Sequence, residues 1–400
     1  MTNVENIMKQ MPFVYKPQIQ FMLDFFEAMA AFIGRATMAN LSRYGAGSER
    51  RIARWSRHWH GFDFMLFNMF LLELAGVFEH KVCAVMDATF LPKSGKHTEG
   101  LAWFHNGSAS RQEKGLEGIA LGLVDRDEHT AYALDIAQTP AELPEGQTRM
   151  DFYLNHFTQH AKALLPYTRY LLADGGFSNK KFVNGVKDAG FDLISKLRAD
   201  ANLRYFYEGP KTSGPGRKRV YDGKVDLDQL DLSRWEVLAS PFPNAKVFSA
   251  VVNHKRWGCS LRVVMIRGKG NSKRKTLLFS TDTTLSGLEI IEMYQERFLI
   301  EFLFRDSKQF TGLGHAQVRD SSALTFFMNG ALSTLNLLRL KDRDHSGIFG
   351  PRVISIAAWK RRKYNEKFIE RISVNCGLDL EAIKSHPGYE NACNFGVQAA

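Results

Sequence analysis

The residue types best suited to chemistry lie in one short segment, residues 294–308. Its polar side chains recur at spacings of three, four and seven residues: Tyr294, Arg297, Glu301 and Lys308. On a helix of 3.6 residues per turn these spacings bring the side chains onto one face. We expect Glu301 to face a cleft flanked by Arg297 and Lys308, although a simple i,i+4 ion pair of Arg297 with Glu301 would also explain the pattern. The apolar side chains of the segment are expected to pack against the domain: Phe298, Leu299, Phe302 and Leu303.

Two more acids follow apolar segments that read as strands. Residues 82–86 form one such strand, which ends at Asp87, and residues 170–173 form another, which ends at Asp174 before two glycines. Open α/β sheets place functional groups at strand ends of this kind. A single Asp at a strand end is more often a turn residue or a helix cap. The inference therefore rests on the joint pattern, in which Glu301 joins Asp87 and Asp174 at one sheet edge.

Three clustered carboxylates repel one another unless a cation lies among them. Hard oxygen ligands, without Cys or His in the cluster, favour Mg²⁺ or Mn²⁺ over zinc. Two such ions about 3.5–4 Å apart form the standard clamp for in-line attack at a phosphodiester. We predict that Asp87 bridges two ions and that Asp174 and Glu301 each hold one.

The elements that must position these acids follow a recognisable order: three strands in a meander, then helix, strand, helix and strand. Strands are expected at residues 82–86, 119–124, 131–136, 170–174 and 191–198, and helices at residues 149–165 and 180–189. A β-rich insertion with basic, Gly- and Pro-containing loops follows at residues 199–285. After the helix of Glu301, a long apolar helix is expected at residues 321–340, in the core rather than at an interface.

The N-terminal part reads as helical, with apolar helices at residues 18–33 and 62–78. Between them, residues 37–57 have the pattern of a helix-turn-helix, in which Ser48 caps a basic second helix. Its arginines could face DNA, or they could line a solvated helical hairpin: Arg50, Arg51, Arg54 and Arg57. At the other end we expect a basic run at residues 360–363 and a loose tail after Pro387.

The overall composition favours a polyanionic partner. The 400 residues have a formal net charge of +11, which suits nucleic acid or an anionic membrane surface. No run of eighteen apolar residues and no N-terminal secretory signal occurs, so we expect a soluble, cytoplasmic protein without a membrane span.

Cysteine and histidine spacing does not indicate a metal site. The four cysteines are scattered without a CxxC pair, which disfavours a zinc site or a disulfide framework and fits a reducing compartment. His156 and His160 stand at i,i+4 on an expected helix, which is a zinc-ligand spacing. No Glu or Cys accompanies them in a motif, so we interpret them as ordinary helix-face histidines.

Three segments resemble the DDE transposases of bacterial insertion sequences. The spacing Tyr294-x₂-Arg297-x₃-Glu301-x₆-Lys308 is similar at every defined position to the signature of the insertion-sequence-four (YREK) family. Residues 85–90 resemble the first catalytic block of that family, and residues 172–177 resemble its second. The similarity spans roughly residues 80–315.

The order of elements resembles the RNase H-like fold. The fold class we expect is therefore α/β, with an RNase H-like core (a mixed five-stranded sheet with flanking helices), a β-rich insertion and a helical N-terminal region. The expected domains are the N-terminal region at residues 1–80, the core at residues 81–198 and 286–345, the insertion at residues 199–285, and a basic C-terminal region at residues 346–400.

The resemblance implies cut-and-paste transposition, which is metal-dependent cleavage at transposon ends, through a hairpin, followed by strand transfer into target DNA. It implies that Asp87, Asp174 and Glu301 form the catalytic, metal-binding triad with two Mg²⁺ or Mn²⁺ ions. The remaining signature residues would contact terminal DNA phosphates: Tyr294, Arg297 and Lys308. In some relatives an insertion-domain tryptophan stacks on a flipped base. Trp257 is the candidate here and Trp235 the second, although a core position is commoner for Trp.

Basic residues between the first two strands could contact the DNA backbone near Asp87, or form a mobile surface loop: Lys93, Lys96 and Arg111. The expected partners are double-stranded DNA, as terminal inverted repeats and as target, and a second copy of the chain that pairs the two ends. The location expected is the bacterial cytoplasm, at the nucleoid. Two alternatives stay open: a catalytically inactive DNA-binding relative, and a stand-alone metal-dependent DNA endonuclease without strand transfer.

Overall fold

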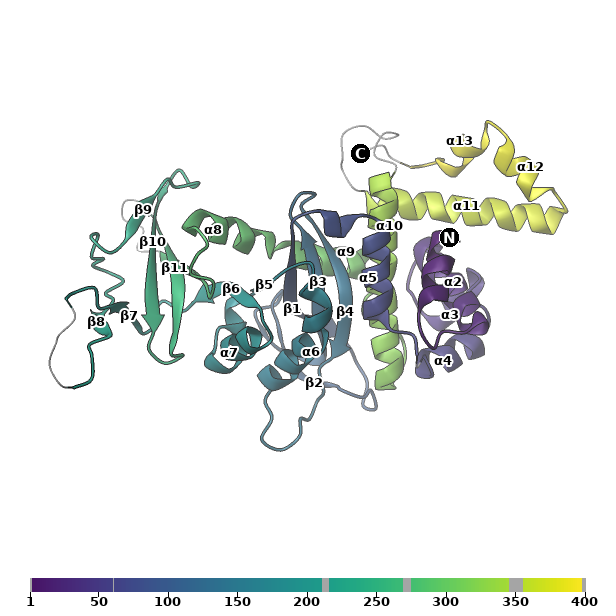
Figure 1. Cartoon of the computed structure of the whole chain (residues 1–400). Helices are drawn as coiled ribbons and strands as arrows, with labels where there is room; N and C mark the ends of the chain where they lie inside the picture. Colours follow the sequence, from purple (N-terminus) through teal and green to yellow (C-terminus); the bar gives the residue numbers. More distant parts are fainter. Residues whose placement is uncertain (1, 60, 211–215, 269–274, 345–354, 398–400) are drawn as a thin grey trace.

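The computed structural model of the chain describes residues 2–59, 61–210, 216–268, 275–344 and 355–397. The molecule is elongated, with strands of the insertion at one end, the central sheet in the middle and a helical region at the other end (Figure 1). Among the described residues, twelve strands hydrogen-bond into a single sheet.

The centre of the sheet holds the strands of the core. They are β1 (Val82–Pro92), β3 (Arg111–Asp125), β4 (Thr130–Gln138), β5 (Tyr170–Ala173) and β6 (Asp192–Leu197). β3 pairs antiparallel with both β1 and β4, whereas β5 pairs parallel with β1 and β6. The helices α6 (Arg149–Leu164) and α7 (Lys180–Asp188) connect β4 to β5 and β5 to β6. This is the arrangement of an RNase H-like core, and the predicted fold class is confirmed.

β1 is longer than the sequence indicated. We expected it to end at Asp87, but it continues to Pro92, because β3 pairs with it along its whole length up to Gly115. Its parallel pairing with β5 does stop early, at Met86 opposite Ala173. Asp87 therefore lies inside β1, at the point where the neighbouring strand ends. A strand that the sequence did not indicate, β2 (Ala102–Asn106), pairs with the first residues of β3.

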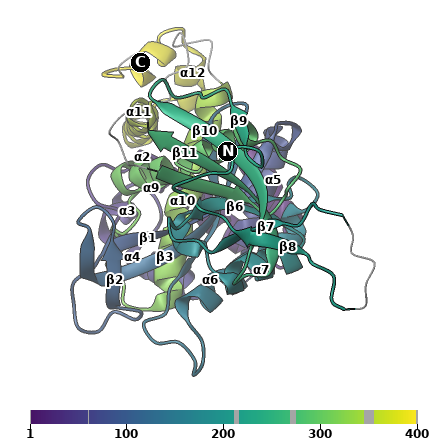
Figure 2. The ribbon, with the colours of Figure 1, turned by 90° about the vertical axis from the view of Figure 1, so that its left-hand side faces the viewer.

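The insertion continues the central sheet. Its strands are β7 (Leu203–Phe206), β8 (Tyr221–Lys224), β9 (Glu236–Leu238), β10 (Ala245–His254), β11 (Cys259–Gly268) and β12 (Lys275–Ser280). β12 pairs antiparallel with β11 on one side and with β6 on the other. Seen from this end, β10 and β11 lie in front of the core (Figure 2). Parts of the predicted basic loops, residues 211–215 and 269–274, lie outside the described residues.

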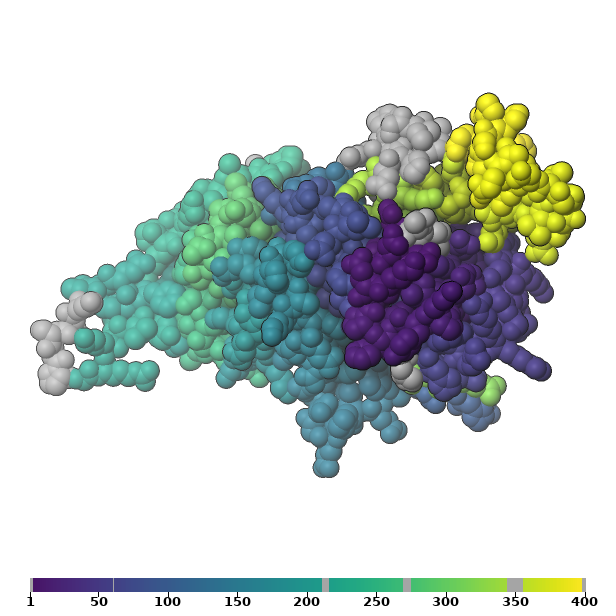
Figure 3. Space-filling model, turned by 45° about the vertical axis from the view of Figure 1, so that its right-hand side comes forward, coloured from purple at the N-terminus to yellow at the C-terminus, as the bar shows by residue number. Residues whose placement is uncertain are grey.

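Two groups of helices cover the opposite end. The N-terminal helices are α1 (Thr2–Gln10), α2 (Lys16–Ala31), α3 (Met38–Arg43), α4 (Glu49–Arg57) and α5 (Phe64–Leu74), and the C-terminal helices are α10 (Ser321–Asp344), α11 (Ile356–Cys376), α12 (Leu380–Ser385) and α13 (Tyr389–Cys393). Figure 3 shows both groups packed together, the first in purple and blue and the last three helices in yellow. None of the helices in the described ranges is long and apolar enough to cross a membrane.

Both helices of the pair α3 and α4 have N-caps, and the cap at Ser48 is the one that the sequence predicted. Thr37 accepts a hydrogen bond from Asn40 N and Ser48 accepts one from Arg51 N, each at 3.2 Å. Such caps satisfy backbone donors that a helix cannot pair internally. The two short helices of the helix-turn-helix pattern therefore form where the sequence placed them.

The prediction of a loose tail after Pro387 is wrong for the described part of the C-terminus. Residues 389–393 form α13, and this segment is fixed to α11 by Arg362, a member of the basic run. Arg362 donates hydrogen bonds to Glu390 at 3.0 Å and to Asn394 at 2.7 Å. The charge of this arginine is neutralised within the protein and is not available to a polyanion.

α10 closes the outer edge of the core sheet. Asn329 pairs with both backbone groups of Ile136, at 2.8 and 3.1 Å, and Asn336 does the same with Ala133, at 2.7 and 3.0 Å. Arg339 adds a bond to the carbonyl of Ala131. An uncovered edge strand exposes such groups to pairing with another chain. The buried apolar residues of α10 place it in the core, as predicted.

Candidate active site

The sheet brings the two strand acids together. Ala173 lies opposite Met86 in the parallel β1–β5 pair, so Asp87 and Asp174 follow at adjacent positions. Asp174 caps the short 3₁₀ turn Gly175–Phe177 and accepts a hydrogen bond from Gly176 N at 3.5 Å. Ser195 of β6 donates to the Asp174 carbonyl at 3.0 Å, which fixes the end of β5. The predicted meeting of these acids at one edge is therefore a property of the strand register.

The segment that supplies Glu301 is not the single continuous helix that the spacing predicted. It is divided into α8 (Gly287–Glu296), α9 (Leu299–Asp306) and a π-helical turn, Ser307–Thr311. At the break the backbone bonds tighten to the i,i+3 type, with Phe298 N bonded to Gln295 O at 3.2 Å. π-Helical turns are rare in proteins, and those that occur lie frequently at functional sites.

Side chains of this segment contact all three acids. Arg297 Nη1 donates to Asp87 Oδ2 at 3.3 Å, and its Nη2 donates to Glu301 Oε1 at 2.8 Å. Tyr294 donates its hydroxyl to Asp174 Oδ1 at 3.5 Å. The Arg297 side chain is only 5% exposed, so a buried guanidinium lies between the carboxylates of β1 and α9.

The electrostatics of the site favour additional positive charge. Burial raises the pKa of the Asp87 carboxyl to about 7, against the opposing effects of Arg297 and the Ala88 N–H, while Asp174 and Glu301 raise it further. Burial acts to lower the pKa of Arg297, but Asp87 and Glu301 outweigh burial, and that pKa lies above its usual value. One guanidinium thus faces three carboxylates, which leaves negative charge to be balanced.

The donor set fits a hard divalent cation. All three side chains offer carboxylate oxygens, the ligands that Mg²⁺ and Mn²⁺ prefer. Glu301 is about half exposed, at 46% of its side chain, so an ion can reach the site from solvent. The ligand atoms of the three acids do not all lie within 4.8 Å of one another. In the described part of the chain, the ligand atoms of two other groups do: Asp135, His156 and His160, and His80, Asp125 and Asp127. In this conformation Arg297 is bonded to Asp87 and Glu301, two of the side chains that could hold such an ion.

The apolar residues around Glu301 pack differently from the prediction. Leu303 is buried and Leu299 is partly buried, but Phe298 and Phe302 are about half exposed, at 49% and 46%. The expectation that these two phenylalanines pack inward is wrong, because the break before α9 turns Ile300 and Phe304 toward the core instead.

Lys308 lies in the π-helical turn and is partly buried, and burial lowers the pKa of its ammonium group. Within the described residues it forms neither a hydrogen bond nor an ion pair with Glu301. Of the two cations expected to flank Glu301, only Arg297 contacts it in this conformation.

The three basic residues expected between the first two strands have different environments, and Arg111 is the first residue of β3. Lys93 donates to the carbonyl of Ala316 and is partly buried, whereas Lys96 is exposed. Arg111 is exposed and bonded to Glu113 at 2.6 Å. Of these three predicted DNA contacts, Lys96 is the one presented freely at the surface.

Both candidate tryptophans of the insertion are buried. Trp257 is 7% exposed and stacks on His254, with 3.8 Å between ring centroids. Trp235 is 2% exposed and donates to the Tyr205 hydroxyl at 3.0 Å. A base-stacking role for Trp257 would require its ring to leave His254.

Reasoning from the sequence missed one polar residue beside His156 and His160. Asp135 of β4 has its carboxylate 3.8 Å from His156 Nε2 and 3.6 Å from His160 Nε2. The linear spacing of the histidines gives no sign of Asp135, because it comes from a different element. An acid within an otherwise buried strand was the one available signal.

An RNase H-like sheet with acids on its central strands is typical of metal-dependent nucleases. Residues 18–250 match the family model described as DDE superfamily endonuclease, and this is more than half of the 400 residues. The chain therefore belongs to the DDE superfamily endonucleases and is a DDE transposase-like protein whose family acts on DNA with divalent metal ions. The match includes Asp87 and Asp174 and ends before Glu301. No curated protein matches the chain.

Proposed function

We propose that the chain is a DDE transposase of the insertion-sequence-four (YREK) family, which cleaves transposon ends and joins them to target DNA by cut-and-paste transposition. The observation that supports this most directly is the set of contacts from Tyr294 and Arg297 to the acids. Arg297 touches both Asp87 and Glu301, and Tyr294 touches Asp174. Because the family match ends before residue 294, these contacts support the third acid independently.

In this proposal Asp87, Asp174 and Glu301 hold two Mg²⁺ or Mn²⁺ ions. When bound, such ions activate the attacking water or 3′-hydroxyl and stabilise the leaving oxygen. Asp87 must lose its proton to become a ligand, since its pKa is raised to about 7 in the protein alone. For both acids to hold ions, Arg297 would have to leave them. Together with Tyr294 and Lys308, it is then free to contact the terminal DNA phosphates.

The helix pair α3–α4 is the proposed reader of the terminal inverted repeats. Arg50, Arg54 and Arg57 are exposed on α4, as such a surface requires. Arg51 has a different role, because it forms an ion pair with Asp24 of α2 at 2.7 Å. The proposed DNA-facing set is therefore reduced from four arginines to three.

The wider DNA surface is proposed to include Lys96, with Lys93, Arg111 and Trp257 joining it only after they leave their present partners. The net charge of +11 suits this long polyanion. A homodimer is proposed because two transposon ends must be paired before they are joined.

The test is an assay with purified protein, oligonucleotides of the genomic element's ends and supercoiled target DNA. Wild type is compared with Asp174→Ala and Glu301→Gln. The matched control is Glu292→Gln, because Glu292 is an exposed acid on α8, 3.7 Å from Arg126. We expect Mg²⁺-dependent cleavage and strand transfer by wild type and by the control. We expect a loss of at least about 10³-fold in both triad variants, since each removes a metal ligand.

Other outcomes separate the alternatives. End cleavage without strand transfer identifies a stand-alone endonuclease. Binding of the ends without cleavage identifies an inactive DNA-binding relative. If the triad variants cut and join as well as wild type does, the assignment of Asp174 and Glu301 is wrong.

A further inference from the structure

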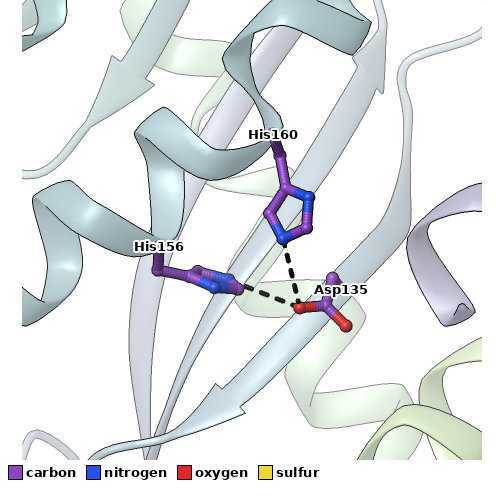
Figure 4. A group of neighbouring side chains, drawn as sticks. All are labelled: Asp135, His156 and His160. Carbon is purple, nitrogen blue, oxygen red and sulfur yellow. Dashed lines mark ion pairs between the residues drawn. The ribbon is translucent and has the colours of Figure 1, made fainter. Parts of the chain in front are cut away.

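A cluster of three potential ligands lies apart from the candidate active site. Asp135 is in β4, and His156 and His160 are on consecutive turns of α6 (Figure 4). Both imidazoles point toward the same carboxylate oxygen, with Nε2 atoms 3.8 and 3.6 Å from Asp135 Oδ2. The function proposed above makes no use of these side chains.

The cluster is on the face of the sheet opposite the three acids. Asp87 pairs with Ala120 of β3, whereas Asp135 pairs with the next residue, Leu121. Paired residues share a face of the sheet and consecutive residues alternate, so Asp135 projects away from the face of Asp87. α6 covers the Asp135 side and α9, which bears Glu301, lies on the other (Figure 1). A ligand at this cluster would not compete with the acids for the same ion.

We propose that Asp135, His156 and His160 form a zinc site that fastens α6 to the edge strand β4. Two imidazole nitrogens and one carboxylate oxygen are common ligands of Zn²⁺. The fourth position would be open to water, because the side chains of His160 and Asp135 are 22% and 20% exposed.

The distances between the histidine nitrogens and the Asp135 oxygen suit a shared metal ion better than direct hydrogen bonds. At 3.6 and 3.8 Å the Nε2–Oδ2 separations exceed a hydrogen bond. Ligand atoms about 2.0–2.1 Å from a tetrahedral zinc lie about 3.3–3.4 Å from one another. The two histidine–carboxylate separations would have to shorten by only a few tenths of an ångström to hold the ion, and all three ligand atoms already lie within 4.8 Å of one another. The ring planes of the two histidines are inclined at 82°, so the nitrogens approach from different directions.

A buried atom in the cluster lacks a partner. His156 is 5% exposed, and its Nε2 has no hydrogen bond within the described residues. An unpaired buried nitrogen destabilises the fold, and a metal bond would satisfy it.

A break in the strand register orients the acid. The β3–β4 pairing shifts between Leu121 and Gly122, so that β4 contains one extra residue just before Asp135. Bulges of this kind re-aim side chains and are frequent at functional positions. α6 is followed in the chain by β5, and Asp174 comes directly after β5. An ion at this cluster would therefore stabilise an element that supports the active site without entering the site itself.

The test is a Co²⁺ titration of the full-length protein after treatment with EDTA. Excess Mg²⁺ is present throughout, to occupy carboxylate-only sites. We expect one Co²⁺ per chain with the visible absorption of a tetrahedral complex. His160→Gln and Asp135→Asn each remove a direct ligand. Either change should weaken Co²⁺ binding by more than about 100-fold, which is the upper range for changes to residues that only support the ligands. His105→Ala, at an exposed histidine of β2, and Glu301→Gln should bind as wild type does.

Far-UV circular dichroism of each variant shows whether it has folded, and Zn²⁺ should raise the melting temperature of wild type but not of folded His160→Gln. The proposal is overturned if folded wild type shows no tetrahedral Co²⁺ spectrum. It is equally overturned if His160→Gln binds Co²⁺ with wild-type affinity, or if binding is lost in Glu301→Gln instead.

Discussion

Asp87 is a partly buried acid whose charged form lowers the stability of the protein. Burial raises the pKa of its carboxyl from an ordinary value of 3.8 to about 7. Since the folded pKa exceeds the unfolded one, the neutral acid favours the fold at low pH. This stabilisation is complete below about pH 4 and is lost as the pH rises through about 7.

The first prediction concerns the stability of the protein in EDTA, which keeps metal ions away from the site. Asp87→Asn should be more stable than wild type at pH 8, by about 2–4 kcal/mol, and the difference should vanish near pH 4. Denaturant unfolding across this pH range measures it, on wild type, on the variant and on Asp188→Asn, an exposed acid of α7. A pH profile of Asp87→Asn that runs parallel to wild type would contradict the argument.

Arg297 acts in the metal-free site as an internal counter-ion. The second prediction is that Arg297→Gln lowers stability in EDTA by about 2 kcal/mol. This is less than the loss of a fully buried pair, because Glu301 is 46% exposed. Mn²⁺ should then raise the melting temperature of the variant by more than that of wild type, because the ion replaces the missing cation.

Differential scanning fluorimetry with and without Mn²⁺ measures both effects. The matched control is Arg305→Gln, which removes an arginine of α9 that is 63% exposed and pairs with the adjacent Asp306. Exposed pairs of this kind contribute little to stability. If Mn²⁺ raises the melting temperatures of Arg297→Gln and of wild type equally, the guanidinium of Arg297 does not occupy the place of a metal ion.

Among the elements, α10 does more than fill the core. Its asparagines at positions 329 and 336 are seven residues apart, which is two helical turns, and each pairs with a backbone amide of the edge strand β4. α10 thereby supplies hydrogen-bond partners for backbone groups of an edge strand. Such an edge would otherwise have to be shielded by charge or by a bulge.

The third prediction concerns this contact. Asn336→Ala should destabilise the protein by about 2–4 kcal/mol, because it leaves the N–H and C=O of Ala133 buried without a partner. It should also increase self-association, which light scattering detects. Asn155→Ala, at an exposed position of α6, should change stability by less than about 0.5 kcal/mol. If Asn336→Ala leaves the stability unchanged, water replaces the side chain at this edge.

In the whole molecule, the insertion and the catalytic core share one continuous sheet. β12 is the joint, since Leu277 pairs with Leu197 of β6 and with Met265 of β11. The core and the insertion are thus linked by backbone hydrogen bonds as well as by side-chain packing. Bending at this joint would break ladder bonds on one side or the other.

The fourth prediction is that β12 exchanges its amide hydrogens as slowly as β5 and β6 do. Hydrogen–deuterium exchange with mass spectrometry measures this, with the edge strand β8 as the fast-exchanging reference. An insertion that folds as a separate unit would instead open at β12 and exchange there at the rate of β8. Such a result would contradict the continuous sheet.

The sequence determined the elements and the chemistry of the acids. Strand and helix periodicity placed β4, β5, β6, α6 and α7 close to their observed bounds, because local hydrophobic pattern and capping depend on neighbours in the chain. β1 and β3 are both considerably longer than the sequence predicted. The sequence predicted that Asp87 and Asp174 both end strands and therefore lie close together. The parallel register does bring them to adjacent positions, although Asp87 lies inside β1. The spacing of Arg297 and Glu301 predicted their ion pair, since i,i+4 geometry survives the break between α8 and α9.

Tertiary structure alone decided which distant groups meet. The extension of β1 past Asp87, the joining of β12 to β6 and the closure of β4 by α10 all depend on backbone partners that lie far away in the sequence. Asp135 reaches His156 and His160 for the same reason, through a bulge and a helix crossing that no linear spacing encodes. Periodicity is a property of each segment by itself, whereas register, edges and clustered ligands belong to pairs of segments.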